Sequence, residues 1–535
     1  MASLGRASAL VGAGTIVSRV TGLVRNVVLA AAVGVVGSGA ADAFGIANQL
    51  PNSIFALISS GLLAGVIVPQ IVKAVRTHAD GGSAFVSKLM TLGVVVLGVI
   101  TAVAMVAAPL LVLVYGGRIP SAEGRALALA LAYWCLPQLF FYGLYALVGE
   151  ALNARRIFGP YAWSPIVNNV VSILGFGAFI WLFGIRRSAS GWTPEMIAVL
   201  GGTATLGIVL QALVLLLFWR RAGLRVRPDF RWRGIGLRHI GRLAGWTFAM
   251  VVASQVAGAV QANIVSAASD VGAANAALQT GWLLFMLPYS VIVISLGTPY
   301  YTQLSEHVAE GRTDAVTDDL SSLTRTIGVF IVGVLAAMLA AIVPLARVFT
   351  DGPDTAVALA WVLGAFLVAL LPLAFQFGIQ RTFYALHDTR TPFVYTVVQA
   401  VLVIVTTAVA ALTLPLQWLA VGIALGQSSA NIVQFVLAIV LLRRKLGRPL
   451  GLGGAARAVV RFVVAAIPAA AGGWFAFVLL GGTGGWATSD RFAGFLAAAL
   501  VGVVSLVVYV VFLAILRAPE LQTAVRTVRR FLPGR

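Results

Sequence analysis

Long apolar stretches recur along the whole chain, and they set the first expectation about its fold. Each is long enough to cross a hydrocarbon core about 30 Å thick as an α-helix. Lipid offers the backbone no hydrogen-bond partner, so such stretches must be helical, and their continuity excludes a β-barrel of alternating residues. We predict about fourteen membrane spans, at residues 8–34, 42–72, 86–115, 126–152, 159–184, 195–219, 239–267, 275–303, 323–349, 355–383, 392–414, 417–442, 457–481 and 492–516.

The basic residues between these spans predict the orientation in the membrane. When the N-terminus is placed in the cytoplasm, 29 of the 37 lysines and arginines fall in cytoplasmic loops and 6 fall in loops on the other side. This asymmetry follows the positive-inside rule and supports an even number of spans, with both termini cytoplasmic. The two remaining basic residues, Arg19 and Arg25, lie inside the first span.

An internal repeat divides the chain. The pattern Leu-Pro-x-x-Phe-x-x-Gly begins at Leu136 and again at Leu371, an offset of 235 residues. A repeat of six helices keeps its orientation, so the sequence predicts two lobes related by an axis along the membrane normal, as in transporters. The expected all-α membrane protein has an N-terminal lobe (1–222), a basic cytoplasmic linker (223–238), a C-terminal lobe (239–446), and an extra helix pair with a basic tail (447–535).

Composition excludes several other classes of protein. The chain has 535 residues, of which 60% are hydrophobic and only 10% charged, against about 25% charged in soluble domains. The net charge of +20 is explained by topology, so we expect membrane lipids and no nucleic acid as partners. Cys135 is the only cysteine, the four histidines are far apart in sequence, and no phosphate-binding loop is present. We therefore expect a transporter rather than an enzyme, with no cofactor and no metal site.

Arg19 and Arg25 are the strongest candidates for a functional site. An arginine at mid-bilayer costs about 3 kcal/mol or more, so such residues usually face a polar cavity. Six residues place the two on different helix faces, about 9 Å apart along the axis, unless a bend at Gly22 turns both toward one cavity. A guanidinium group can donate two parallel hydrogen bonds to the oxygens of one phosphate, which favours an anion site. The alternative is snorkelling from a first helix that is shorter or more interfacial.

Further polar residues lie in or near the same spans. Asp42 could form a gating ion pair with a cavity arginine, or it could simply favour the start of its helix through the macrodipole. The others could line the cavity or form hydrogen bonds between helices. They are Ser18, Asn26, Asn48, Asn52, Asn168, Asn169, Gln255, Gln261 and Asn263.

Several of these segments resemble the N-terminal part of the proteins of one known family. The run from Ser18 to Arg25 reads Ser-Arg-Val-Thr-Gly-Leu-Val-Arg, and Asp42-Ala43-Phe44, Leu50-Pro51-Asn52 and Val68-Pro69 follow it. Together they look like the MurJ/MviN family of the multidrug/oligosaccharidyl-lipid/polysaccharide exporter superfamily, and the similarity runs along nearly the whole chain. The arginine-rich, lysine-poor composition is typical of a GC-rich bacterial genome.

The resemblance implies a lipid II flippase. Such proteins carry the undecaprenyl-diphosphate-linked peptidoglycan precursor across the bacterial inner membrane by alternating access. Arg19 and Arg25 would bind the diphosphate of this lipid-linked glycan, with Ser18, Asn26 and Asn52 adding hydrogen bonds. The lipid tail would lie in a groove made by the last two spans, and proteins of cell-wall synthesis would be possible partners.

The chain also departs from the pattern of this family. Asn26 stands where members often have an acidic residue, Phe55 and Ala56 where many have arginines, and Gly281–Leu283 where many have an acidic–basic pair. Spans eleven and twelve hold no acidic candidate for the sodium site of some members. Two alternatives therefore stay open: an exporter of drugs or of another polyprenyl-linked glycan, and a non-transporting scaffold for cell-wall assembly. Few membrane carboxylates are present to couple drug export, which argues against that alternative.

Overall fold

A computed structural model of the chain describes residues 2–60, 83–155, 157–219, 227–230 and 237–522. These residues are largely helical, and none of them forms a strand. Thirteen of the described helical segments are long and apolar enough to cross a membrane. They coincide with thirteen of the fourteen predicted spans, so the all-α multi-pass membrane fold is confirmed. The remaining span begins with α2 (Gly39–Ile58), and its continuation through Val68-Pro69 lies outside the described residues.

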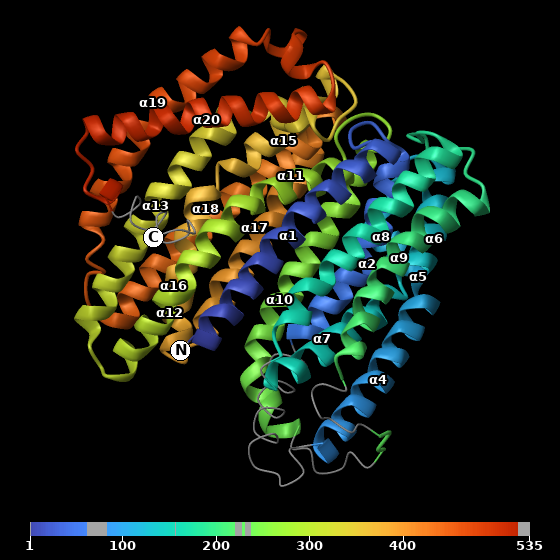
Figure 1. Cartoon of the computed structure of the whole chain (residues 1–535), viewed down its shortest axis with the longest axis horizontal. Coiled ribbons are helices and arrows are strands. Elements are labelled where there is room, and N and C mark those ends of the chain that lie inside the picture. The colour runs from blue at the N-terminus through green and yellow to red at the C-terminus, as the bar shows by residue number, and fades with distance from the viewer. Residues whose placement is uncertain (1, 61–82, 156, 220–226, 231–236, 523–535) are drawn as a thin grey trace. The chain divides into compact units, whose positions relative to one another are not determined.

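Contacts divide the chain into two compact units, Met1–Asp270 and Val271–Arg535. In the first unit, α1 packs along α8, and α8 packs along α9 (Figure 1). The elements of this unit, besides α2, are α1 (Ala2–Val33), α4 (Ser83–Val106), α5 (Ala108–Gly116), α6 (Ala122–Cys135), α7 (Gln138–Ala154), α8 (Gly159–Phe183), α9 (Pro194–Leu217), α10 (Leu237–Val265) and the 3-10 turn η3 (Ser266–Ala268).

In the second unit, α17 packs against α18, and the last two helices pack against each other and against α13. Its longer elements are α11 (Asn275–Pro288), the π-helical turn η4 (Tyr289–Val293), α12 (Ile294–Ala309), α13 (Thr313–Ala340), α14 (Ile342–Arg347), α15 (Pro353–Leu367), α16 (Leu370–Ala385), α17 (Arg390–Thr413), α18 (Leu416–Leu446), α19 (Gly453–Leu479) and α20 (Arg491–Ile515). Two short 3-10 turns, η5 (Gly482–Gly484) and η6 (Trp486–Thr488), connect the last two helices.

The repeated Leu-Pro motif marks equivalent helix breaks in the two units. Pro137 lies between α6 and α7, and Pro372 lies in the first turn of α16, just after the break that follows α15. Proline removes a backbone donor and clashes with the preceding turn, so it is favoured at or near the start of a helix. The same local signal therefore interrupts a membrane-length segment once in each unit.

The C-terminal helix pair is joined to the second unit by a close-packed apolar cluster. Small residues of α13 and α19 meet Tyr509 of α20, whose hydroxyl donates to the Val329 carbonyl oxygen at 3.0 Å. A Cβ at Gly333 would lie 2.7 Å from the Tyr509 ring, so only glycine permits this approach. These contacts seat α19 and α20 against α13 in Figure 1.

The contact-based division differs from the lobes expected from the repeat. The C-terminal lobe was expected to begin at residue 239, but α10 packs with α2 and α5 and belongs to the first unit, which ends at Asp270. Hydrogen bonds from α10 side chains to both neighbours explain this. Of the basic linker, residues 227–230 are described, and the backbone N–H groups of Arg227 and Asp229 donate to hydroxyls of α4. The lobe boundaries taken from the repeat stay a prediction.

Candidate functional site

The two candidate arginines lie on one uninterrupted helix. α1 continues through Gly22, and its membrane-length segment, Gly12–Val33, contains both Arg19 and Arg25. Both side chains are half-buried. Both therefore lie within a helical segment that is long and apolar enough to cross a membrane, and their depth in the bilayer stays a prediction.

Asn169 of α8 fixes α1 beside the first arginine. Its Nδ2 donates to the Ser18 carbonyl oxygen at 2.9 Å and to Thr21 Oγ1 at 3.0 Å. Gly22 faces the same amide, and a Cβ there would lie 3.5 Å from Asn169 Nδ2. Ser18 thus contributes its backbone to helix packing. The Asn26 amide, in turn, donates to the Gly22 carbonyl oxygen at 2.9 Å within α1.

A polar cluster surrounds the second arginine. Arg25 interacts electrostatically with Tyr142 of α7, and Asn52 of α2 lies within side-chain hydrogen-bonding reach of the same hydroxyl. The Tyr142 hydroxyl donates to Gln138 Oε1 at 3.3 Å, and Gln138 Nε2 donates to Thr205 Oγ1 at 3.1 Å. Tyr142, Gln138 and Thr205 thus form a hydrogen-bonded chain across α7 and α9, and Arg25 interacts electrostatically with its first member. A guanidinium is itself suited to bind an anion.

Tyr142 was not among the residues singled out from the sequence. It stands between Phe140 and Gly143 of the repeated motif, and that position was the signal that could have drawn attention to it. The ring of Phe55, which occupies the place where many members of the resembled family have an arginine, lies 5.7 Å from the Tyr142 ring. An aromatic contact thus takes the place of that charge in this chain.

Aromatic rings also pack at residues 281–283, the second place where the chain departs from the pattern of the resembled family. Trp282 of α11 contacts Phe285 and Phe366, with ring centroids 5.1 Å and 5.5 Å away. Gly281 is buried, whereas Trp282 is 38% exposed, so the ring contacts cover only part of this stretch. The apolar residues at 281–283 are consistent with their surroundings.

Asp42 is buried at the start of α2, with 1% of its surface exposed. Its Oδ2 accepts a hydrogen bond from Ser269 Oγ at 2.8 Å. Nearby, Asp270 Oδ1 accepts from the Gly39 N–H at 2.8 Å, and Ser38 Oγ accepts from the Ala41 N–H as the N-cap. Carboxylates at a helix N-terminus are favoured by the macrodipole, so this arrangement supports the helix-start interpretation. The gating ion pair stays a prediction.

Two other candidate amides lie on α2 and α8. The carbonyl oxygen of Asn48 accepts from Asn52 Nδ2 at 3.1 Å, one turn later in the same helix. Asn168 is buried, and its Oδ1 accepts from Ser172 Oγ at 3.3 Å. Gly207 of α9 approaches Asn168 so closely that a Cβ there would lie 2.4 Å from the amide oxygen. Asn168 thus lies at the contact between α8 and α9.

The two candidate amides of α10 bind neighbouring helices. Gln255 Nε2 donates to the Ser53 carbonyl oxygen of α2 at 2.7 Å, and Asn263 Nδ2 donates to the Leu113 carbonyl oxygen of α5 at 3.0 Å. In a membrane such bonds hold helices together. A role of either residue in binding substrate stays a prediction.

The structure offers few groups for other chemistry. Among the described residues, no group of three or more His, Cys, Asp or Glu side chains is placed to hold a metal ion. Cys135 is buried and unpaired with another cysteine. The chemistry at α1 is therefore that of a cation with amide and hydroxyl neighbours.

Comparison with known protein families gives one family match. A family model described as "Lipid II flippase MurJ" matches residues 29–493. A probable lipid II flippase MurJ of Haemophilus influenzae is 28% identical over 406 residues, covering 71% of this chain and 75% of the relative. One from a Synechocystis species is 25% identical over 541 residues, covering 97% of this chain and 96% of the relative.

Solved structures support the same fold. A lipid II flippase MurJ in an inward closed conformation aligns with a TM-score of 0.71 at 20% identity, covering 95% of this chain and 98% of that one. A multidrug resistance transporter of the MATE family in an inward-facing conformation aligns with a TM-score of 0.55 at 16% identity, covering 76% of this chain and 93% of that one. At these identities the likeness concerns the fold alone.

Proposed function

The chain belongs to the lipid II flippase MurJ family, and from this premise we propose that it moves undecaprenyl-diphosphate-linked peptidoglycan precursor across the bacterial inner membrane by alternating access. The activity needs no bond to be made or broken, so the protein acts as a transporter and not as an enzyme. Both termini face the cytoplasm in this proposal, in accord with the distribution of basic residues. Proteins of cell-wall synthesis are its proposed partners.

One observation carries the proposal for the binding site. Arg25 lies in an apolar helical segment of membrane-spanning length and interacts electrostatically with Tyr142, and Asn52 lies within hydrogen-bonding reach of the same phenol. A diphosphate offers oxygens that accept hydrogen bonds from guanidinium, phenol and amide groups. We assign the second phosphate group to Arg19, six residues earlier on α1, with Ser18 beside Arg19 and Asn26 beside Arg25.

A second candidate function shares the same site chemistry. Any polyprenyl-diphosphate-linked glycan would present the same charged group to Arg19 and Arg25. Such a substrate would differ only in its sugars, which the arginines do not distinguish. Drug export receives less support, because Asp42 is hydrogen-bonded at the start of α2 and Glu150 stands near the end of α7.

Depletion of the protein in its host cell tests the proposal. We expect lipid II to accumulate on the cytoplasmic side of the membrane, and we expect re-expression of the wild type to reverse this. The double variant R19A/R25A should fail to rescue at equal expression, whereas R118A, at an exposed arginine outside α1, should rescue fully.

The outcomes of this depletion experiment distinguish the two candidate functions and test the assigned site. Accumulation of a different polyprenyl-linked glycan, with lipid II unchanged, would favour the second candidate function. Full rescue by R19A/R25A would refute the assigned site while leaving membership in the family untouched.

A further inference from the structure

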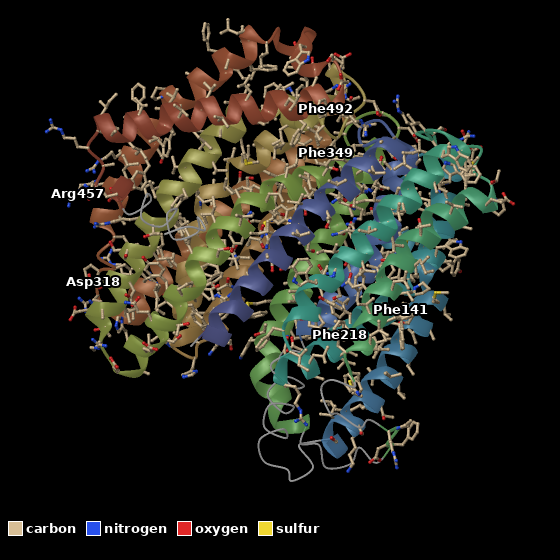
Figure 2. The ribbon with its side chains drawn as sticks, viewed as in Figure 1. Phe141, Phe218, Asp318, Phe349, Arg457 and Phe492 are labelled. Atoms are coloured by element: carbon tan, nitrogen blue, oxygen red, sulfur yellow. The ribbon has the colours of Figure 1, made fainter. Side chains whose placement is uncertain are left out.

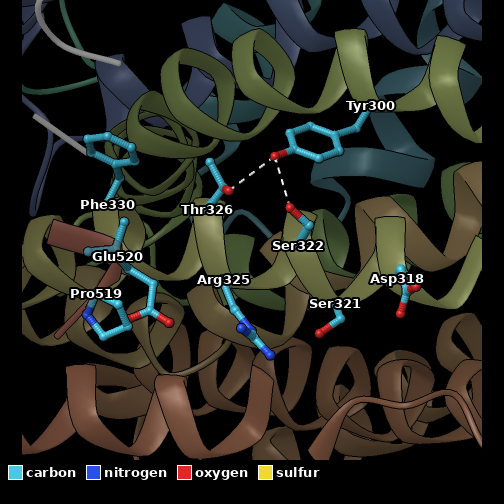
Figure 3. A pocket seen from close by; sticks show the side chains of 10 residues that line it. Tyr300, Asp318, Ser321, Ser322, Arg325, Thr326, Phe330, Pro519 and Glu520 are labelled. Carbon is cyan, nitrogen blue, oxygen red and sulfur yellow. Dashed lines mark hydrogen bonds between the residues drawn. The ribbon is translucent and has the colours of Figure 1, made fainter. Parts of the chain in front are cut away.

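A cavity lies in the second unit, whereas the candidate arginines of α1 belong to the first unit. It has a volume of about 410 Å³, within the range of about 300–1,000 Å³ that is common for small-ligand pockets. It opens between α12, α13 and the segment after α20 (Figure 3). Its lining residues are Tyr300, Asp318, Ser321, Ser322, Arg325, Thr326, Val329, Phe330, Pro519 and Glu520.

The cavity lies where three helices change from polar to apolar sequence. On α13 the charged residues end at Arg325, and none follows to Ala340. On α19 none follows Arg461, and on α20 none occurs between Phe492 and Leu516. Figure 2 shows Asp318 and Arg457 at one end of this unit and Phe349 and Phe492 at the other. Such a boundary is the level at which phospholipid headgroups lie.

One part of the lining is suited to a phosphate. Within the part of the chain that the structure describes, Arg325 makes no hydrogen bond or ion pair, and its buried Nε lacks a partner. The Tyr300 hydroxyl lies 3.2 Å from both Ser322 Oγ and Thr326 Oγ1, and these hydroxyls can turn toward a ligand. Gly454 of α19 approaches the Arg325 guanidinium so closely that a side chain there would displace it. An arginine with several hydroxyls is a typical phosphate-binding set.

The other part of the lining is acidic. Asp318 is exposed, while Glu520 is 8% exposed. Buried Glu520 Oε2 accepts no hydrogen bond, but Arg461 Nη1 lies 3.8 Å from it, within ion-pair distance. The charge of Glu520 is therefore balanced by Arg461, and Asp318 is the exposed carboxylate of the lining. It can bind a cation, and an ammonium group supplies hydrogen-bond donors to its oxygens.

We propose that this cavity binds the headgroup of a phospholipid that carries a primary amine, as in phosphatidylethanolamine. Its phosphate binds Arg325 and the hydroxyls of α12 and α13, and its ammonium group binds Asp318. The acyl chains extend along the apolar continuation of α13. The site is independent of the flippase substrate, because neither its residues nor its charge pattern is shared with α1.

Lipid binding to the purified full-length protein in detergent tests this proposal. Native mass spectrometry would compare phosphatidylethanolamine, phosphatidylglycerol and phosphatidylcholine. Inorganic phosphate, which has neither acyl chains nor an amine, would serve as the control. We expect retention of phosphatidylethanolamine above the other two lipids, and no competition by phosphate. The variant R325Q should weaken retention about tenfold, as expected for a lost charge-assisted contact. The variant D318N, at an exposed position, should reduce the preference for the amine lipid without abolishing phospholipid binding.

The matched control is R312Q. Arg312 lies at the same end of the second unit, is exposed, and pairs with Glu310 outside the cavity, so its loss should leave lipid retention unchanged. Equal retention of the three lipids by the wild type, or equal losses in R325Q and R312Q, would overturn the proposal. Competition by inorganic phosphate alone would show a free-anion site and would also overturn it. Thermal unfolding without added lipid would verify that R325Q is folded.

Discussion

Arg25 of α1 and Tyr142 of α7 lie within electrostatic reach of each other, and Asn52 of α2 can hydrogen-bond to the same phenol. Tyr142 in turn donates to Gln138. The first-helix arginine thus has an electrostatic partner on α7 in the first unit.

Substitution of Arg25 should separate the contribution of its charge to lipid II binding from the contribution of its planar shape. The variant R25A should lose most lipid II binding, about tenfold or more, because a charge-assisted contact to the diphosphate disappears. The variant R25K should recover part of it, since lysine keeps the charge but not the planar fork. Titration of purified protein with lipid II would measure both, with R118A as the control. Equal affinity of R25A and R118A would contradict the assignment.

Asn169 is predicted to stabilise the contact between α1 and α8. The variant N169L keeps a similar volume but loses the bonds to Ser18 and Thr21, so it should lower the free energy of unfolding by about 1 kcal/mol. Thermal unfolding in detergent would detect this. V170L, at a neighbouring side chain that is 43% exposed, should have little effect. An unchanged midpoint for N169L would show that the two bonds do not stabilise the helix pair.

Arg347 is predicted to anchor the turn before α20. It is 5% exposed, and its guanidinium donates to three carbonyl oxygens, those of Thr350 at 2.5 Å, Thr488 at 2.8 Å and Ser489 at 3.0 Å. The variant R347A leaves these buried oxygens without a donor and should cost about 3 kcal/mol or more in unfolding free energy.

The control for Arg347 is R448A. Arg448 forms an ion pair with Asp314, which is largely exposed, and such pairs contribute about 0–1 kcal/mol. Chemical unfolding of both variants in the same detergent would compare them. If R448A is as unstable as R347A, the buried network is not the source of the stabilisation.

Asp388, in the loop between α16 and α17, predicts a pH-dependent contribution to stability. Burial alone would raise the pKa of its carboxyl group, but hydrogen bonds from Thr391 and contact with Lys445 outweigh burial and leave the pKa below 3.8. Because the folded-state pKa is depressed, the ionised form stabilises the fold above the unfolded-state pKa, and this contribution is lost as pH falls through the folded-state value.

The variant D388N tests this contribution. It should unfold at a lower temperature than the wild type near neutral pH. The difference should begin to shrink as pH falls below about 3.9 and should disappear once the pH is below the folded-state pKa. Thermal unfolding across a pH series would show it. A difference that is the same at every pH would mean that the charge of Asp388 does not contribute.

The sequence predicted those features that depend on local pattern. Apolar length indicated the spans, and loop charge singled out Arg19 and Arg25. The helix breaks at Pro137 and Pro372 were not predicted, because spans 126–152 and 355–383 were expected to be continuous. Features that depend on which helices meet were not predicted. The proximity of Tyr142 to Arg25 and the packing of α10 with the first unit arise from contacts between residues far apart in sequence, which periodicity does not encode.

The partners of individual polar and aromatic residues could not be predicted from the sequence either. The sequence around Gln255 and Asn263 does not distinguish a residue that lines a cavity from one that donates to a backbone oxygen. Only the positions of Ser53 and Leu113 show the hydrogen bonds that they form. Likewise, Phe55 and Trp282 pack against aromatic rings, but nothing in the sequence alone identified their ring partners.

The central claim is that the arginines of α1 bind the diphosphate of a lipid-linked glycan. The most direct measurement is the affinity of the purified protein for lipid II, compared between the wild type and R19A/R25A. Undecaprenol, which lacks phosphate, serves as the reference ligand in both. The account predicts that the double variant loses its preference for lipid II over undecaprenol while retaining the fold. An unchanged preference in the double variant would contradict it.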